Sequence, residues 1–167
     1  HAGAGKIIVT GRSADARKLE IARRLGADHT IDVDNEPALE RIKSYTGGRG
    51  ADVVVEVTSY ATEPVRDALG YVRPGGTIVL AGVKGFKPVD DFVSDLIVRN
   101  EITIRGVIGV TSSGYRKAID LIHARTTPLE IMHTHDFPLE QAERAIRTLA
   151  RQVEGAESIH SCLIPPV

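Results

Sequence analysis

Short apolar runs alternate with amphipathic stretches along most of the chain. Ile7–Val9 and Val53–Val55 are β-branched runs, which are typical of strands covered on both faces in a parallel sheet. The strands predicted from this pattern cover residues 6–10, 28–33, 51–57, 77–81, 101–107 and 159–164, with an extended segment at 131–137. The predicted helices cover residues 14–25, 62–71 and 92–99, and another begins near residue 37.

Two stretches in the second half of the chain place apolar residues at i, i+3, i+4 and i+7, which predicts helices with one buried stripe. These residues are Tyr115, Ala118, Ile119 and Ile122 in the first stretch, and Ala142, Ala145, Ile146 and Leu149 in the second. The alternation of strands and helices predicts an α/β fold with a doubly wound parallel sheet. This alternation stops in the last part of the chain. We therefore expect a domain at 1–130 and a segment at 131–167 that packs against something outside this chain.

Composition excludes several classes of protein. Charged residues make up 26% of the 167 positions and the formal net charge is −1, without a block of like charges, which argues against nucleic-acid and membrane-surface binding. No apolar run is long enough to span a membrane, and no signal-peptide pattern is present. Cys162 is the only cysteine, so no intrachain disulfide can form, and the cytoplasm is the expected location.

The first predicted strand ends in the turn Gly11-Arg12-Ser13, and a predicted helix follows. A strand, a glycine-containing turn and a helix form the nucleotide crevices of α/β proteins, at the carboxyl ends of the strands. Arg12 can bind phosphate bidentately, and the Ser13 hydroxyl adds a donor. In the alternative interpretation, Arg12 is a solvated turn residue and Ser13 caps the helix.

Other polar patterns are weaker. The glycines of 47–50 precede a strand instead of opening a helix, which predicts a tight turn and no phosphate site. His133 and His135 share a face of an extended segment, but no ligand partner lies at metal-site spacing, so no metal site is expected in this chain. His135 is expected to pack the final segment and Cys162 to be a small buried hydrophobe. No catalytic triad or carboxylate pair is recognisable.

Several motifs recur in an order that resembles the nucleotide-binding half of the medium-chain (zinc-type) alcohol dehydrogenase superfamily, over nearly the whole chain. They are Ala22-Arg23-Arg24-Leu25-Gly26-Ala27-Asp28, Gly47-Gly48-Arg49-Gly50-Ala51-Asp52-Val53-Val54, Arg73-Pro74-Gly75-Gly76, Ala81-Gly82-Val83, Glu101-Ile102-Thr103-Ile104-Arg105-Gly106 and Thr134-His135-Asp136-Phe137-Pro138-Leu139. The resemblance implies a Rossmann-type fold and reversible hydride transfer between NAD(P) and an alcohol/carbonyl pair.

Two family hallmarks are absent from the sequence. One is the Gly-x-Gly-x-x-Gly turn that binds the pyrophosphate, together with the strand before it, and the other is the N-terminal catalytic domain. In the family's strand order, the absent strand lies between those at 6–10 and 51–57. We therefore expect an N-terminally truncated, incomplete fragment, inactive by itself and without catalytic residues of its own. Zinc, where used, would belong to the missing domain.

The resemblance implies a set of cofactor-binding residues at the carboxyl ends of the strands and near the last helix. They are Gly11, Arg12, Ser13, Lys18, Thr58, Ser59, Gly82, Val83, Val107, Ile108, Gly109 and Arg151, with Arg17 and Arg147 as weaker candidates. NAD-preferring enzymes usually carry an acidic residue where this chain has Gly11, which favours NADP, with NAD as the alternative.

Other functions stay open. They are a zinc-free quinone or enoyl reductase of the same superfamily and a non-catalytic nucleotide-binding module. A methyltransferase is the least favoured, because it typically has an acidic residue at the place of Gly11. Relatives commonly pair through the edge strand at 101–107, so the expected partners are a dinucleotide, the missing domain and a second copy of the chain.

Overall fold

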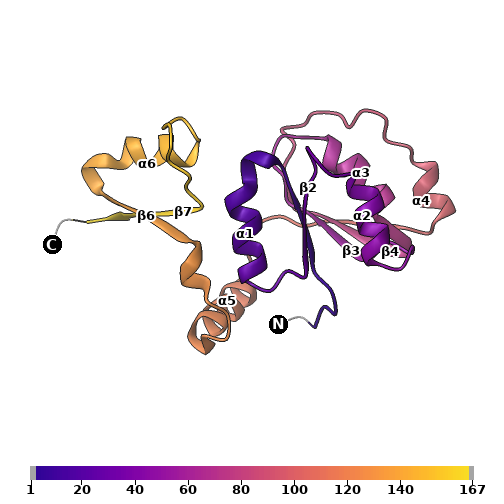
Figure 1. Ribbon diagram of the computed structural model, residues 1–167, viewed down its shortest axis with the longest axis horizontal. Coiled ribbons are helices and arrows are strands. Elements are labelled where there is room, and N and C mark those ends of the chain that lie inside the picture. Colours follow the sequence, from indigo (N-terminus) through magenta and orange to yellow (C-terminus); the bar gives the residue numbers. More distant parts are fainter. Residues whose placement is uncertain (1–2, 166–167) are drawn as a thin grey trace. The chain divides into compact units, whose positions relative to one another are not determined.

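Strands and helices alternate through residues 3–165, the part of the chain that the computed structural model describes (Figure 1). All strand pairs in this part are parallel, which confirms the predicted α/β class. The strands form three sheets, with orders β1-β2, β3-β4-β5 and β6-β7. The chain divides into two compact units, of which the second comprises Glu36–Thr111 and the first the remainder, and each is described by itself. The predicted boundary at residue 130 falls inside the first unit.

The amino-terminal part of the first unit is a β-α-β arrangement. β1 (Ile8–Gly11) pairs with β2 (His29–Asp32) in a register that joins Ile8 to His29 and Gly11 to Asp32. A short 3-10 turn, η1 (Ser13–Asp15), leads into α1 (Ala16–Arg24), which packs on both strands. The register places the residues after β1 beside those after β2, because parallel strands share their carboxyl edge.

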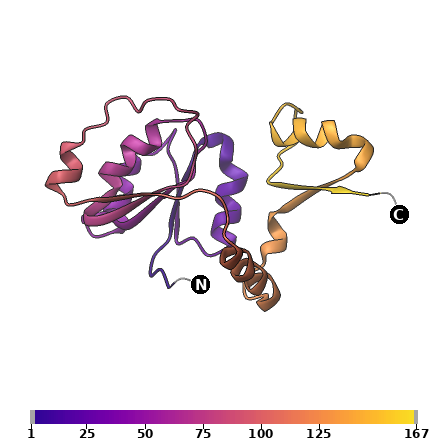
Figure 2. The same cartoon turned by 180° about the vertical axis from the view of Figure 1, so that it is seen from behind.

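The carboxyl-terminal part of the first unit contains a second parallel strand pair (Figure 2). Its elements are α5 (Ser112–Ala124), η2 (Leu129–Met132), β6 (His133–Pro138), η3 (Leu139–Gln141), α6 (Ala142–Leu149) and β7 (His160–Ile164). α6 packs on β6 and β7, with Ala145 and Thr148 buried. This arrangement brings His133 opposite His160 and Asp136 opposite Cys162.

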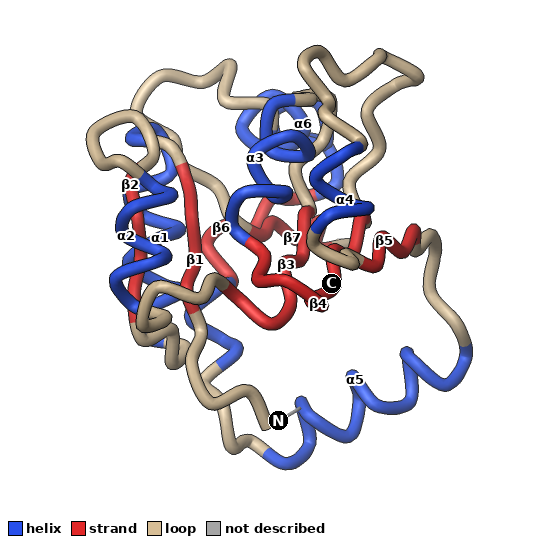
Figure 3. Tube along the Cα trace, turned by 90° about the vertical axis from the view of Figure 1, so that its right-hand side faces the viewer, coloured by secondary structure: helices blue, strands red, loops and turns tan. Residues whose placement is uncertain are grey.

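The second unit contains a three-stranded sheet with its own core. Its elements are α2 (Ala38–Tyr45), β3 (Ala51–Glu56), α3 (Glu63–Tyr71), β4 (Val72–Leu80), α4 (Asp95–Arg99) and β5 (Thr103–Gly106), which the tube view colours by type (Figure 3). The core consists of Ala68, Leu69, Val72, Ile78 and Ile102. β4 is the central strand, so the loops after β3, β4 and β5 lie at one edge.

Two boundaries differ by more than two residues from the sequence prediction. The strand expected at 77–81 begins at Val72, because the Pro74-Gly75-Gly76 segment forms an irregularity within β4 instead of a separate turn; Val72 already pairs with Ala51. The helix expected at 92–99 begins only at Asp95. Ser94 is the residue that precedes the first turn of this helix.

Four predictions of buried apolar surface were wrong. Ile7 is 44% exposed, and Ile8 and Val9 are only partly buried, so the first strand is not covered on both faces. Val53 and Val55 are 54% and 59% exposed, so β3 is covered on only one face. The apolar stripe of α5 is exposed, and no residue of this helix is buried. On α6, Ile146 and Leu149 are exposed while Ala145 is buried. Periodicity identified these faces as apolar, but within residues 3–165 the packing supplies no cover for them. None of the described helices is long and apolar enough to cross a membrane.

Candidate functional site

Gly11 ends β1, and its lack of a side chain serves helix packing. A Cβ at this position would lie 3.0 Å from Cδ2 of Leu19, a buried residue of α1. An added Cβ would therefore require the Leu19 side chain to shift by a few tenths of an ångström. The glycine has a structural reason that does not involve a ligand, and it brings the following turn close to the start of α1.

Arg12 is held by a carboxylate that the sequence analysis did not single out. Its Nε atom donates to both oxygens of Asp34, at 3.1 and 3.3 Å, while the arginine side chain remains 74% exposed. The backbone amide of Ser13 donates to Oδ2 of the same carboxylate, at 3.0 Å. A guanidinium and a backbone N–H thus converge on one anionic group at the carboxyl edge of β1 and β2.

Ser13 does not cap α1, so the interpretation of this residue as a helix cap was wrong. Its hydroxyl donates to Oδ2 of Asp32 at 2.6 Å and accepts from Nδ2 of Asn35 at 2.8 Å. The Ser13 hydroxyl, followed by the Asn35 amide, lowers the pKa of the exposed Asp32 carboxyl below its ordinary value of 3.8. The hydroxyl is consequently engaged across the turn.

A second charged group lies one turn further along the chain. Asp15 accepts from Nζ of Lys18, at 3.2 Å, and from Nη2 of Arg151, which follows α6. Burial raises the pKa of Asp15, but these two cations and the Arg12 amide outweigh it, so the pKa lies below the ordinary value. Arg151, Lys18 and the Arg12 turn are therefore neighbours in the first unit.

The weaker candidates have other partners. Nη1 of Arg17 donates to the carbonyl oxygen of Glu157 at 2.7 Å. Arg147 pairs with Glu143, one turn earlier on α6, at 2.7 Å. Of the two arginines considered near the last helix, Arg151 is the one that reaches η1.

In the second unit, a buried ion pair joins the loops after β3 and β4. Glu56 is 5% exposed, and its carboxylate accepts from Nζ of Lys84 at 2.7 Å. The other carboxylate oxygen accepts from the Thr58 amide at 2.7 Å, and Lys84 also donates to the Thr58 carbonyl. Thr58 and Ser59 therefore lie in a loop that is fixed by charge as well as by backbone hydrogen bonds.

Gly82 allows the two loops to approach. A Cβ at Gly82 would lie 2.1 Å from the Thr58 carbonyl oxygen, and the neighbouring Val83 carbonyl accepts from the Tyr60 amide at 3.0 Å. The third loop contains Val107, Ile108 and Gly109, with Ile108 92% exposed and Gly109 at a φ of 71°. The second-unit candidates thus occupy three adjacent loops at one edge of the parallel sheet.

The acidic partners of the candidate residues were not predicted from the sequence. Asp32 and Asp34 end and follow β2, and parallel pairing with β1 was enough to place them beside Arg12 and Ser13. Glu56 and Lys84 were also missed. The available signal for Glu56 was an acidic residue directly after the three consecutive valines of β3.

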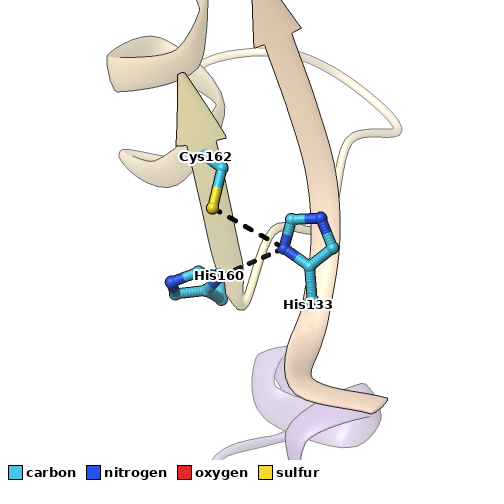
Figure 4. A group of neighbouring side chains, drawn as sticks. All are labelled: His133, His160 and Cys162. Carbon is cyan, nitrogen blue, oxygen red and sulfur yellow. Dashed lines mark hydrogen bonds between the residues drawn. The ribbon is translucent and has the colours of Figure 1, made fainter. Parts of the chain in front are cut away.

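His133, His135 and Cys162 differ in their surroundings. His135 stacks on Phe137, with ring centroids 5.8 Å apart, as expected for a packing residue. His133 instead faces His160 and Cys162 across the β6–β7 pair (Figure 4). Cys162 is only partly buried, so the prediction that it is a small buried hydrophobe was wrong.

Comparison with known proteins gives a consistent result. The family described as zinc-binding dehydrogenase matches residues 1–124. A protein described as a probable alcohol dehydrogenase of Mycobacterium tuberculosis (strain ATCC 25618 / H37Rv) is 36% identical over 98% of this chain and 45% of its own length. The chain thus spans a little under half of that relative.

Two crystal structures share the fold. An alcohol dehydrogenase from Thermotoga maritima aligns with a TM-score of 0.86 at 25% identity, over 98% of this chain and 44% of its own. The other structure is that of a protein from Sinorhizobium meliloti 1021, described as a zinc-binding dehydrogenase and bound to NADP. It aligns with a TM-score of 0.84 at 25% identity, over 98% of this chain and 46% of its own. The family model matches well over half of the residues of this chain. This chain therefore belongs to the zinc-binding dehydrogenases.

Proposed function

We propose that this chain binds the coenzyme of an NADP-dependent oxidoreductase of the alcohol dehydrogenase type. The reaction of the whole protein would be reversible hydride transfer between the nicotinamide and an alcohol/carbonyl pair. The family match and the names of the relatives support the oxidoreductase class. The NADP-bound relative supports the coenzyme class.

The NADP preference is inferred from the Asp34 carboxylate, an anion that the turn after β1 already binds. The Asp34 carboxylate accepts from Nε of Arg12 and from the Ser13 amide, so these donors are arranged for a negatively charged oxygen group. A 2′-phosphate has oxygens of the same kind and more charge, and Arg12 is exposed enough to receive it. We infer that the phosphate takes the place of Asp34 when NADP binds.

The nicotinamide supplies the hydride chemistry when the coenzyme is bound, and the residues of this chain bind and orient it. Arg12 and Ser13 would hold the adenosine end. In the second unit, Thr58, Gly82 and Ile108 are separate candidates for coenzyme contacts, in the loops after β3, β4 and β5. The chain contains no Gly-x-Gly-x-x-Gly turn, so none of its own glycine motifs is assigned to the pyrophosphate.

The test is a fluorescence titration of the chain with NADPH and with NADH, in wild type and in Arg12→Ala. Hydrogen bonds to a charged group contribute about 1.5–3 kcal/mol, so NADPH affinity should fall about 10- to 100-fold. NADH affinity should stay unchanged. Arg24→Ala, at an exposed arginine of α1, is the matched control and should alter neither affinity. An unchanged NADPH-to-NADH ratio in Arg12→Ala would contradict the proposal.

A further inference from the structure

Three side chains with metal-binding atoms converge between β6 and β7. They are His133, His160 and Cys162, whose ligand atoms all lie within 4.8 Å of one another (Figure 4). The strand register brings them together, since His133 pairs with His160 and Cys162 lies two residues further along β7 on the same face. The cluster is therefore a consequence of the backbone arrangement.

The spacing of the ligand atoms fits a tetrahedral ion. Zn–N and Zn–S bonds of about 2.0 and 2.3 Å with tetrahedral angles separate two nitrogens by about 3.3 Å, and a nitrogen and a sulfur by about 3.6 Å. Nδ1 of His133 lies 3.2 Å from Nδ1 of His160 and 4.0 Å from Sγ of Cys162. The nitrogen pair already matches, and the pair of His133 and Cys162 must close by a few tenths of an ångström, within a cluster whose ligand atoms all lie within 4.8 Å of one another.

The far side of the His133 ring carries the partner that metal-binding histidines usually have. Its Nε2 atom lies 3.0 Å from Oδ1 of Asp136. A proton on Nε2, donated to this carboxylate, leaves the lone pair of Nδ1 directed at the cluster and makes the ring a better ligand. Asp136 thus acts as a positioning residue for His133.

The cluster is also accessible to an ion. His133 and His160 are both exposed at the wall of a groove of about 890 Å³, which η2 and the end of α5 also line. Two imidazoles and a thiolate are the ligand types that favour Zn²⁺ over Mg²⁺ or Ca²⁺.

We propose that His133, His160 and Cys162 form a zinc-type metal site. Binding forms one Zn–S and two Zn–N bonds, and the thiol proton leaves to solvent. The fourth position, for which the cluster offers no further His or Cys, would hold water.

The test is titration of the reduced, metal-free chain with Co²⁺, a spectroscopic probe for zinc sites, followed by displacement with Zn²⁺. We expect one Co²⁺ per chain, the visible bands of a tetrahedral ion and a near-ultraviolet thiolate-to-cobalt band. Cys162→Ser should remove the near-ultraviolet band, and His160→Gln should weaken binding sharply. His123→Ala, at an exposed histidine of α5, should change neither property.

Asp136→Asn separates positioning from general stability. It should weaken Co²⁺ binding by about 10- to 100-fold while leaving the absorption bands in place. Circular dichroism of each metal-free variant checks that the fold is intact. Absence of the thiolate band in the wild type, or its survival in Cys162→Ser, would overturn the proposal. Unchanged Co²⁺ affinity in His160→Gln would also overturn the proposal, even if Cys162→Ser does not fold.

Discussion

We propose that the Asp34 carboxylate and a 2′-phosphate compete for the same donors. Asp34 follows β2 and holds both the Arg12 side chain and the Ser13 amide. A carboxylate in this position also repels a phosphate, at a cost of about 1 kcal/mol for unit charges 4 Å apart in water. The preference for NADP or NAD at this turn therefore depends on how strongly Arg12 attracts the 2′-phosphate and how strongly Asp34 repels it.

Asp34→Asn tests this balance. The amide oxygen can still accept from the Ser13 amide, but the negative charge is gone and Arg12 is released. NADPH affinity should rise about fivefold, the equivalent of about 1 kcal/mol, with a smaller effect on NADH. Fluorescence titration measures both affinities. Asp120→Asn, at an exposed carboxylate of α5, is the control, and an unchanged or lower NADPH affinity in Asp34→Asn would count against the competition.

At the scale of elements, the second unit fixes the loops at its sheet edge by close backbone approach. The loop after β3 is held by the buried Glu56–Lys84 pair, and the loop after β4 passes it at Gly82. The Ala81 and Gly82 amides both donate to the Glu56 carbonyl oxygen, at 2.8 and 3.2 Å. These contacts leave no room for a side chain between the loops.

Gly82→Ala should therefore destabilise the second unit. Its Cβ would overlap the Thr58 carbonyl oxygen, and the backbone strain needed to relieve the overlap costs about 1–3 kcal/mol. Urea denaturation measures the change in the free energy of unfolding. Gly106→Ala is the matched control, because a Cβ there meets nothing within 4 Å. Equal stability of the two variants would show that the loops can separate without cost.

Local sequence patterns predicted where strands and helices lie better than they predicted which faces of these elements are buried. The β-branched runs indicated β1 and β3 because they are typical of strands in a parallel sheet, and the helical spacings indicated α5 and α6 because each of these helices has one apolar stripe. Burial of those faces depends on what packs against them, which periodicity does not contain. This is why Val55 was expected to be buried and is exposed.

The same distinction applies to the candidate site. Gly11, Arg12 and Ser13 were recognisable from a strand–turn–helix pattern, which is local. Their partner Asp34 and the cluster of His133 with Cys162 arise from the pairing of strands distant in sequence. A register between two parallel strands has to be known before such neighbours can be named.

At the scale of the whole molecule, the candidate residues fall into two units, each with a parallel sheet whose carboxyl edge carries polar or glycine-containing loops. The first unit holds the charged turn at Arg12, and the second holds the loops at Thr58, Gly82 and Ile108. We propose that the first unit recognises the phosphate that distinguishes NADP from NAD. A probe that contains only the adenosine end tests this claim without the rest of the coenzyme.

The most direct measurement is an NMR titration of the ¹⁵N-labelled chain with 2′,5′-ADP and, separately, with 5′-AMP. We expect 2′,5′-ADP to shift the Arg12 Nε and Ser13 amide resonances, because its 2′-phosphate replaces the Asp34 carboxylate at both donors. The same nucleotide without that phosphate should leave them in place. Equal shifts with both nucleotides, or no shift with 2′,5′-ADP, would contradict the assignment of this turn to the 2′-phosphate.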